Sequence, residues 1–177
     1  QACYFARDVM QIALAGSGVW LSDGATNIMP VGPHRGEGLS QDQRDENRET
    51  VHRAWRIHYD HCRRSLANGF YQGWDLHPAQ LPTRFAAIYA MFLEEMEPAG
   101  RRLRGFIDKA AKASLVGDQF DDAATGQGLL NFFVRAVNCG ALTESEASVQ
   151  AGLTMEQLRS GSFAMITGSD GEPGRPE

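Results

Sequence analysis

The 177-residue chain predicts an α/β fold, on the strength of two helix-to-strand units that follow one another. In each unit an amphipathic helix ends at glycine, and a short apolar run with strand propensity comes next. The helices are expected at residues 2–15 and 51–66, and the strands at residues 19–21 and 70–77. Because parallel strands need a crossover helix between them, this order favours an α/β barrel or an open parallel sheet over a helical bundle.

The first helix is predicted from Phe5, Val9 and Ile12, which fall on one face, and it stops at Gly16 and Gly18. The chain begins at Gln1 and enters this helix without a preceding strand or cap. We therefore expect that the sequence starts inside a longer protein. A processing boundary in an otherwise whole protein is the alternative.

Residues 30–50 are rich in glycine, proline and charged side chains and predict a long mobile loop, which is either an active-site lid or a linker. The helix at 51–66 that follows carries its apolar residues on one stripe. The second strand ends at His77, because Pro78 cannot donate a hydrogen bond to a strand ladder.

Beyond this strand the pattern is helical. Apolar stripes at helical spacing follow one another, the second of them beginning after Gly100. Capping boxes at Thr143 with Glu146 and at Thr154 with Gln157 each announce a short helix. The expected organisation is a barrel portion at 1–115 that includes the loop at 30–50, a helical C-terminal extension at 116–166, and a disordered tail at 167–177.

Charge and composition exclude several classes of protein. The net charge is −5, and no extended basic cluster offers an electrostatic footprint for nucleic acid or an anionic membrane. No apolar run approaches the length of a membrane span. Three scattered cysteines are typical of reduced, buried thiols, which predicts a cytoplasmic protein.

Four features in the same order resemble the C-terminal part of the citrate lyase β-subunit and malyl-CoA lyase superfamily. Residues 73–80 (GWDLHPAQ) resemble its His-Pro-x-Gln strand end, and residues 21–25 (LSDGA) resemble its preceding Ile-Asp-Gly strand. The helix at 51–66 stands between them, as in the family. Residues 117–121 (GDQFD) resemble its C-terminal Gly-x-Met-Ile-Asp segment. Within the superfamily the chain is most similar to an uncharacterised aldolase-like group.

The resemblance implies the C-terminal part of a (β/α)8 TIM-type barrel followed by a helical extension. It also implies a carbon–carbon lyase that acts on a keto acid or acyl-CoA substrate through an enolate, in a homo-oligomer. In that family Mg²⁺ stabilises the enolate, and its carboxylate ligands are expected upstream of this chain. No metal ligand is therefore assigned here. Trp74, Asp75, Asp122 and the long loop depart from the family pattern and leave the substrate identity open.

Four residues are candidates for the site. Asp121 is the catalytic candidate, because the matching aspartate reaches a neighbouring subunit's active site in the family; its alternative role is a helix N-cap. His77, Asp23 and Gln80 are candidates for substrate binding at the ends of the strands. His77 could equally hold the next loop through a backbone hydrogen bond, and Asp23 could belong to an ordinary Asp-Gly turn.

Two other patterns are weighed against simpler explanations. His58, His61 and Cys62 suggest a metal cluster, but His58 and Cys62 lie one turn apart on an apolar stripe and predict core packing. Residues 146–158 resemble a helix-turn-helix, yet the expected recognition helix offers only Arg159 in an acidic chain. DNA binding and a non-catalytic structural role are therefore the competing functions.

Overall fold

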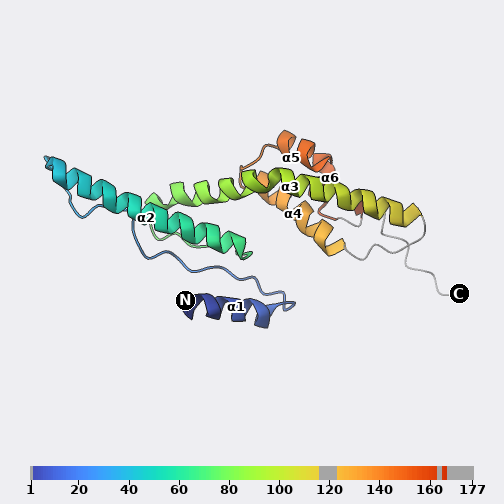
Figure 1. Ribbon diagram of the computed structural model, residues 1–177, viewed down its shortest axis with the longest axis horizontal. Coiled ribbons are helices and arrows are strands. Elements are labelled where there is room, and N and C mark those ends of the chain that lie inside the picture. Colours follow the sequence, from blue (N-terminus) through green and yellow to red (C-terminus); the bar gives the residue numbers. More distant parts are fainter. Residues whose placement is uncertain (1, 116–122, 163–164, 167–177) are drawn as a thin grey trace. The chain divides into compact units, whose positions relative to one another are not determined.

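The computed structural model describes residues 2–115, 123–162 and 165–166, and every regular element in them is a helix (Figure 1). The elements are α1 (Ala2–Leu14), α2 (Gln41–Ala67), the 3₁₀ helix η1 (Pro78–Gln80), α3 (Leu81–Leu115), α4 (Ala123–Asn138), α5 (Glu144–Ala151) and α6 (Met155–Ser160). The predicted α/β fold, as the C-terminal part of a (β/α)8 barrel, is therefore wrong. The described chain is all-helical.

The two segments that were expected to be barrel strands are irregular. Within the described residues no ladder of backbone hydrogen bonds joins residues 19–21 to residues 70–77, and the hydrogen bond from the Asp23 amide to the Gln72 carbonyl, at 3.1 Å, lies beyond the end of the first segment. Val19 and Trp20 are 57% and 77% exposed, so the apolar run that suggested a buried strand lies at the surface. A strand needs a ladder of backbone partners and cover for its apolar side chains; here the ladder is lacking, and of the large apolar side chains in residues 70–77 only Phe70 is buried.

Helix α2 begins ten residues earlier than predicted. Ser40 caps it through a capping box with Gln43, so that residues 41–50 of the expected loop are helical. Their side chains are all polar, and an apolar stripe could not reveal them. Further along, the predicted stripe is confirmed, since Ala54, His58, Cys62 and Leu66 are buried.

Helix α1 has nearly the predicted bounds but packs through the opposite face. Phe5 and Ile12 are 72% and 78% exposed. The contacts of the helix come from its polar side instead, where Gln11 donates to the Asn68 carbonyl at 2.7 Å and the Arg7 guanidinium lies 4.9 Å from the centre of the Phe70 ring. Amphipathicity therefore predicted the helix and not the face it uses.

The chain divides into two compact units, residues 1–88 and 89–177, with the boundary inside α3. In the first unit, the segment after α1 runs along α2 to the amino end of that helix (Figure 1). The core of this unit includes Ala54, Cys62, Leu66, Phe70 and Ala87.

The second unit contains the rest of α3 and the three helices α4, α5 and α6. Its largest fully buried apolar side chains are Leu103, Leu130, Phe133 and Leu158. Helix α3 passes without a break through Gly100, where the sequence suggested an interruption. A methyl group at Gly100 would lie 2.4 Å from the Gln150 carbonyl oxygen, so glycine permits α3 and α5 to approach closely.

Both predicted capping boxes are confirmed. Thr143 with Glu146 begins α5, and Thr154 with Gln157 begins α6. Among the helices described, none combines the length and the apolar character that crossing a bilayer requires. Residues 116–122 at the start of the expected extension, and the expected tail at 167–177, lie outside the described residues.

Candidate functional site

A polar cluster around a buried histidine in the first unit links α2 to the amino end of α3. The His58 ring, 1% exposed, lies between Asp75 and Thr83: its Nε2 is 2.9 Å from the Asp75 Oδ1, and its Nδ1 is 2.7 Å from the Thr83 hydroxyl. The other Asp75 oxygen accepts from the Nε of Arg84 at 2.6 Å. One carboxylate thus holds a cation and an imidazole in place.

Burial decides the charge of this histidine. Desolvation lowers the pKa of His58 below its usual value, and the opposing attraction of Asp75 does not restore it, because Arg84 and His61 also disfavour the charged ring. In the neutral ring, the N–H at Nε2 donates to Asp75, because a carboxylate can only accept, while the Thr83 hydroxyl that contacts Nδ1 donates to the Gln80 carbonyl. The neighbouring Cys62 is also buried, and desolvation raises the pKa of its thiol, so it is a poor nucleophile at neutral pH.

Gln80 connects the two segments that resemble the lyase family. Its side-chain amide donates to the carbonyls of Thr26 at 2.9 Å and Ile28 at 3.3 Å, and its oxygen accepts from the amides of Leu76 and His77. Gln80 is fully buried, and these four bonds use all of its hydrogen-bonding capacity. Here it positions the backbone, and its predicted contact with substrate stays a prediction.

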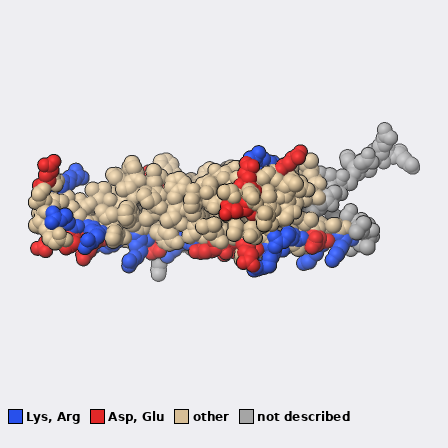
Figure 2. Space-filling model, turned by 90° about the horizontal axis from the view of Figure 1, so that it is seen from above, with Lys and Arg blue, Asp and Glu red and all other residues tan. Residues whose placement is uncertain are grey.

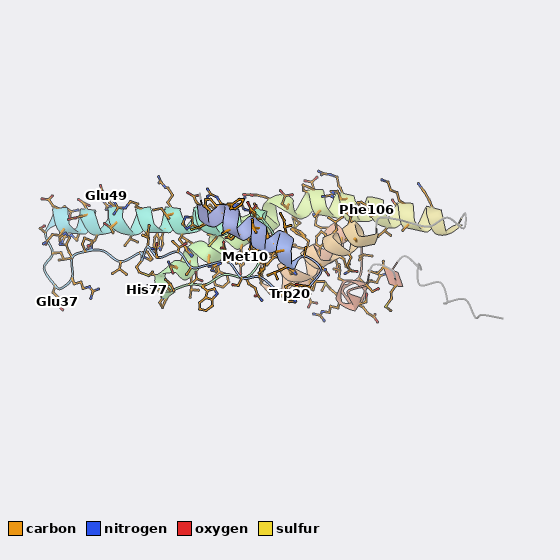
Figure 3. The ribbon with its side chains drawn as sticks, turned by 90° about the horizontal axis from the view of Figure 1, so that it is seen from below. Met10, Trp20, Glu37, Glu49, His77 and Phe106 are labelled. Carbon is orange, nitrogen blue, oxygen red and sulfur yellow. The ribbon has the colours of Figure 1, made fainter. Side chains whose placement is uncertain are left out.

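His77 caps the short helix η1. Its Nδ1 accepts from the Ala79 amide at 3.1 Å, while the Trp55 indole donates to the Ala79 carbonyl at 2.7 Å. The ring is partly exposed, and Nε2 has no hydrogen-bond partner among the described residues. His77 therefore holds the following turn and still has one ring nitrogen for a ligand. Figure 3 labels His77, in the segment at 70–77, and Trp20, in the segment at 19–21, the two segments that were expected to be strands.

Asp23 lies beside α1 and α2. Its carboxylate accepts from the Arg7 guanidinium, the Ser65 hydroxyl and the Gly24 amide. Burial raises the pKa of Asp23, but the hydrogen bonds from Ser65, Gly24 and Arg7 outweigh it and hold that pKa below its usual value. Asp23 is thus an ionised anchor for Arg7 and part of an Asp-Gly turn, and its predicted contact with substrate stays a prediction.

A pocket of about 500 Å³ opens next to Asp23. It lies between the amino-terminal half of α1, residues 23–27 and the carboxyl-terminal half of α2. Its charged and polar lining includes Tyr4, Arg7, Asn27, His61 and Arg64 in addition to Asp23. Its cationic groups outnumber its single carboxylate, which suits an anionic ligand.

No metal site is formed by the described residues, in which three or more His, Cys, Asp or Glu side chains nowhere gather closely enough to hold an ion. His58 and Cys62 approach each other to 3.6 Å, whereas the His61 Nδ1 contacts the Thr26 hydroxyl at 3.0 Å. These residues therefore do not fit Mg²⁺. The catalytic candidate Asp121 and its neighbour Asp122 lie outside the described residues.

Helices α5 and α6 occupy the segment that resembles a helix-turn-helix, and Gly152 between them has the left-handed conformation. Helix α6 has only six residues, and its one arginine, Arg159, pairs with Glu144. Acidic and basic side chains are interspersed over the face that Figure 2 presents. None of these features favours contact with nucleic acid phosphates.

The fold and the site define a class: a helical protein in which the buried His58 binds a partly buried Asp75–Arg84 pair, in the same unit as a cationic pocket. The chain matches the family model described as a domain of unknown function, DUF6986, over residues 1–166, and it belongs to that family. No curated protein and no solved structure gives a significant match.

Sequence reasoning missed Arg7, Arg64, Asp75 and Arg84. Asp75 was interpreted only as a departure from a family pattern. The burial predicted for His58 was the available signal, because a buried imidazole needs polar partners close by.

Proposed function

We propose that this chain contributes substrate-binding residues to a carbon–carbon lyase or aldolase that acts on a keto acid or acyl-CoA type substrate through an enolate. The support comes from the resemblance of residues 21–25, 73–80 and 117–121 to the citrate lyase β-subunit and malyl-CoA lyase superfamily. The proposal concerns the chemistry. It does not include the barrel fold, which the described residues lack.

One observation carries the proposal. The first two resembling segments, which α2 separates in sequence, are linked at their edges. The Asp23 amide donates to the carbonyl of Gln72, just before residues 73–80, and the Gln80 side-chain amide donates to the carbonyl of Thr26, just after residues 21–25. His77 and Asp23 therefore belong to one local structure. Keto acids and acyl-CoA thioesters are anions, which the excess of cationic side chains around the nearby pocket would attract.

In this proposal the described residues bind and orient substrate. Bound Mg²⁺ would neutralise the negative charge that develops on the substrate oxygen, and its ligands would come from outside these residues. Asp121 is the proposed catalytic carboxylate. The proposal also includes a homo-oligomer in the cytoplasm.

The test is an assay of carbon–carbon cleavage of malyl- and citramalyl-type thioesters with Mg²⁺, on the 177-residue chain and on the product of its complete reading frame. We expect the product of the complete reading frame to cleave the thioesters and the 177-residue chain not to. The informative substitution is His77→Asn, because asparagine can still cap η1 but removes the imidazole. It should lower turnover roughly tenfold to a hundredfold, as for a lost hydrogen bond to a charged group.

Two controls accompany this variant. His52→Asn changes an exposed histidine on α2 and should leave turnover unchanged. Asp121→Ala should cost on the order of a hundredfold or more in turnover, whereas Asp122→Ala should not. Absence of cleavage by the complete product would refute the proposed reaction, and turnover by the 177-residue chain would refute the placement of the Mg²⁺ ligands.

A further inference from the structure

The pocket beside Asp23 has one positive charge in excess. Arg7 and Arg64 are the permanent cations of its lining, and Asp23 is the carboxylate. Since Arg7 is paired with Asp23, these two charges compensate each other. Within the described part of the chain, no carboxylate pairs with Arg64, whose charge is left for an occupant.

Arg64 is held in an orientation that suits an anion. Its guanidinium lies over the Tyr4 ring, 4.5 Å from the ring centre. This cation–π contact uses none of the N–H donors of the guanidinium in a conventional hydrogen bond, so they remain available to an occupant. These donors form a fork that matches the two oxygens of a carboxylate.

His61 adds a second donor. Its Nδ1 contacts the Thr26 hydroxyl, which is buried and has no other acceptor in the described residues. A buried hydroxyl needs an acceptor, so Thr26 donates to Nδ1, and the N–H of the neutral ring is then at Nε2. That N–H has no described partner, and the ring lines the pocket.

One more side chain in the lining can donate. The Asn27 side chain lines the pocket without a described partner of its own. By contrast, both oxygens of Asp23 already accept hydrogen bonds, from Arg7, Ser65 and Gly24. The pocket therefore presents unused donors and one unbalanced cation.

We propose that the pocket lined by Arg64, His61, Asn27 and Arg7 binds the carboxylate of a small organic anion, with Arg64 as its principal ligand and Asp23 as the residue that positions Arg7. One excess positive charge balances a monoanionic carboxylate better than a more highly charged phosphate. That this anion is the substrate rests on the proposed function. The binding of a carboxylate does not.

The experiment titrates the full 177-residue chain with pyruvate as the probe and follows the arginine Nε–H and histidine signals by NMR. We expect saturable shifts that weaken with rising salt. Methyl pyruvate, a neutral ester, should not bind, and inorganic phosphate should bind less tightly than pyruvate. Arg64→Gln should weaken pyruvate binding roughly tenfold or more.

The matched control is Arg53→Gln, which removes the same charge from an exposed position of α2 outside the pocket and should retain full affinity. His61→Gln is the second variant and should also weaken binding, which keeps the test valid if Arg64→Gln fails to fold. Four results would each overturn the proposal. They are equal affinity of the wild type and both pocket variants for pyruvate, equal binding of the ester and pyruvate, tighter binding of phosphate than of pyruvate, and no saturation at millimolar pyruvate. Because binding is measured without turnover, a carboxylate site in a protein that cleaves no thioester would refute only the proposed function.

Discussion

At the scale of single residues, His58 shows how burial turns a titratable side chain into a structural one. It lies in the hydrophobic stripe of α2, where an alanine or leucine would be ordinary, and its ring instead joins Asp75 and Thr83. Asp75 also binds Arg84. Removing one member of such a network leaves the others buried without their partners, which costs more than the bond contributes.

The lowered pKa of His58 predicts a pH dependence of stability. The unfolded chain binds a proton on this ring at a higher pH than the folded chain does. Stability that is fully present above the unfolded pKa, about 6.5, is therefore lost as the pH falls below it. The free energy of unfolding of the wild type, measured in urea, should fall between about pH 7 and pH 5. That of His58→Gln should fall less over the same range.

His52→Gln is the control, since it removes an exposed histidine from the same helix. The lowered pKa of Asp23 acts in a different window, because its contribution is lost only as the pH falls from near the usual carboxyl value of 3.8. If His58→Gln and the wild type lose the same stability on acidification, the buried ring is not the group responsible.

At the scale of helices, the close approach of one helix to another can decide which residue a position needs, even against the local preference for helix. Glycine is unfavourable inside a helix, yet Gly100 and Gly105 both lie within α3. They differ in what surrounds them: the Gln150 carbonyl lies against Gly100, while nothing lies within 4 Å of the Cβ position of Gly105.

Gly100→Ala should destabilise the protein by about 1–3 kcal/mol, because the new methyl group must push α3 and α5 apart. Gly105→Ala should stabilise it by about 0.5–1 kcal/mol through helix propensity alone. Chemical denaturation followed by circular dichroism measures both. Stabilisation by both alanines would mean that α3 and α5 do not make this contact.

At the scale of the whole molecule, the chain has two units with separate cores. All three tryptophans, Trp20, Trp55 and Trp74, belong to the first unit. Tryptophan fluorescence therefore reports that unit, while circular dichroism reports the helices of both.

We expect that Gly100→Ala, a change in the second unit, lowers the urea midpoint followed by circular dichroism more than the midpoint followed by tryptophan fluorescence. Units with their own cores can unfold in separate transitions. Equal displacement of the two midpoints would show that the chain unfolds as a single cooperative unit.

The sequence alone determined those features of the helices that depend only on residues close together in the chain. The capping boxes at Thr143 and Thr154 and the buried stripe of α2 could all be predicted, because a cap needs only residues three apart and a stripe only residues on one helix. The same signals missed the first ten residues of α2, where the side chains are all polar, although Ser40 and Gln43 formed a readable capping box.

Tertiary structure alone decided whether residues 19–21 and 70–77 would become strands, which face of α1 would pack, and which polar side chains would meet. A strand depends on a ladder of partners distant in the sequence, and the described chain forms none between these segments. The pairing of Arg7 with Asp23 and of His58 with Asp75 likewise joins residues 16 and 17 positions apart. No local pattern encodes such distances, because they depend on how the helices and loops pack.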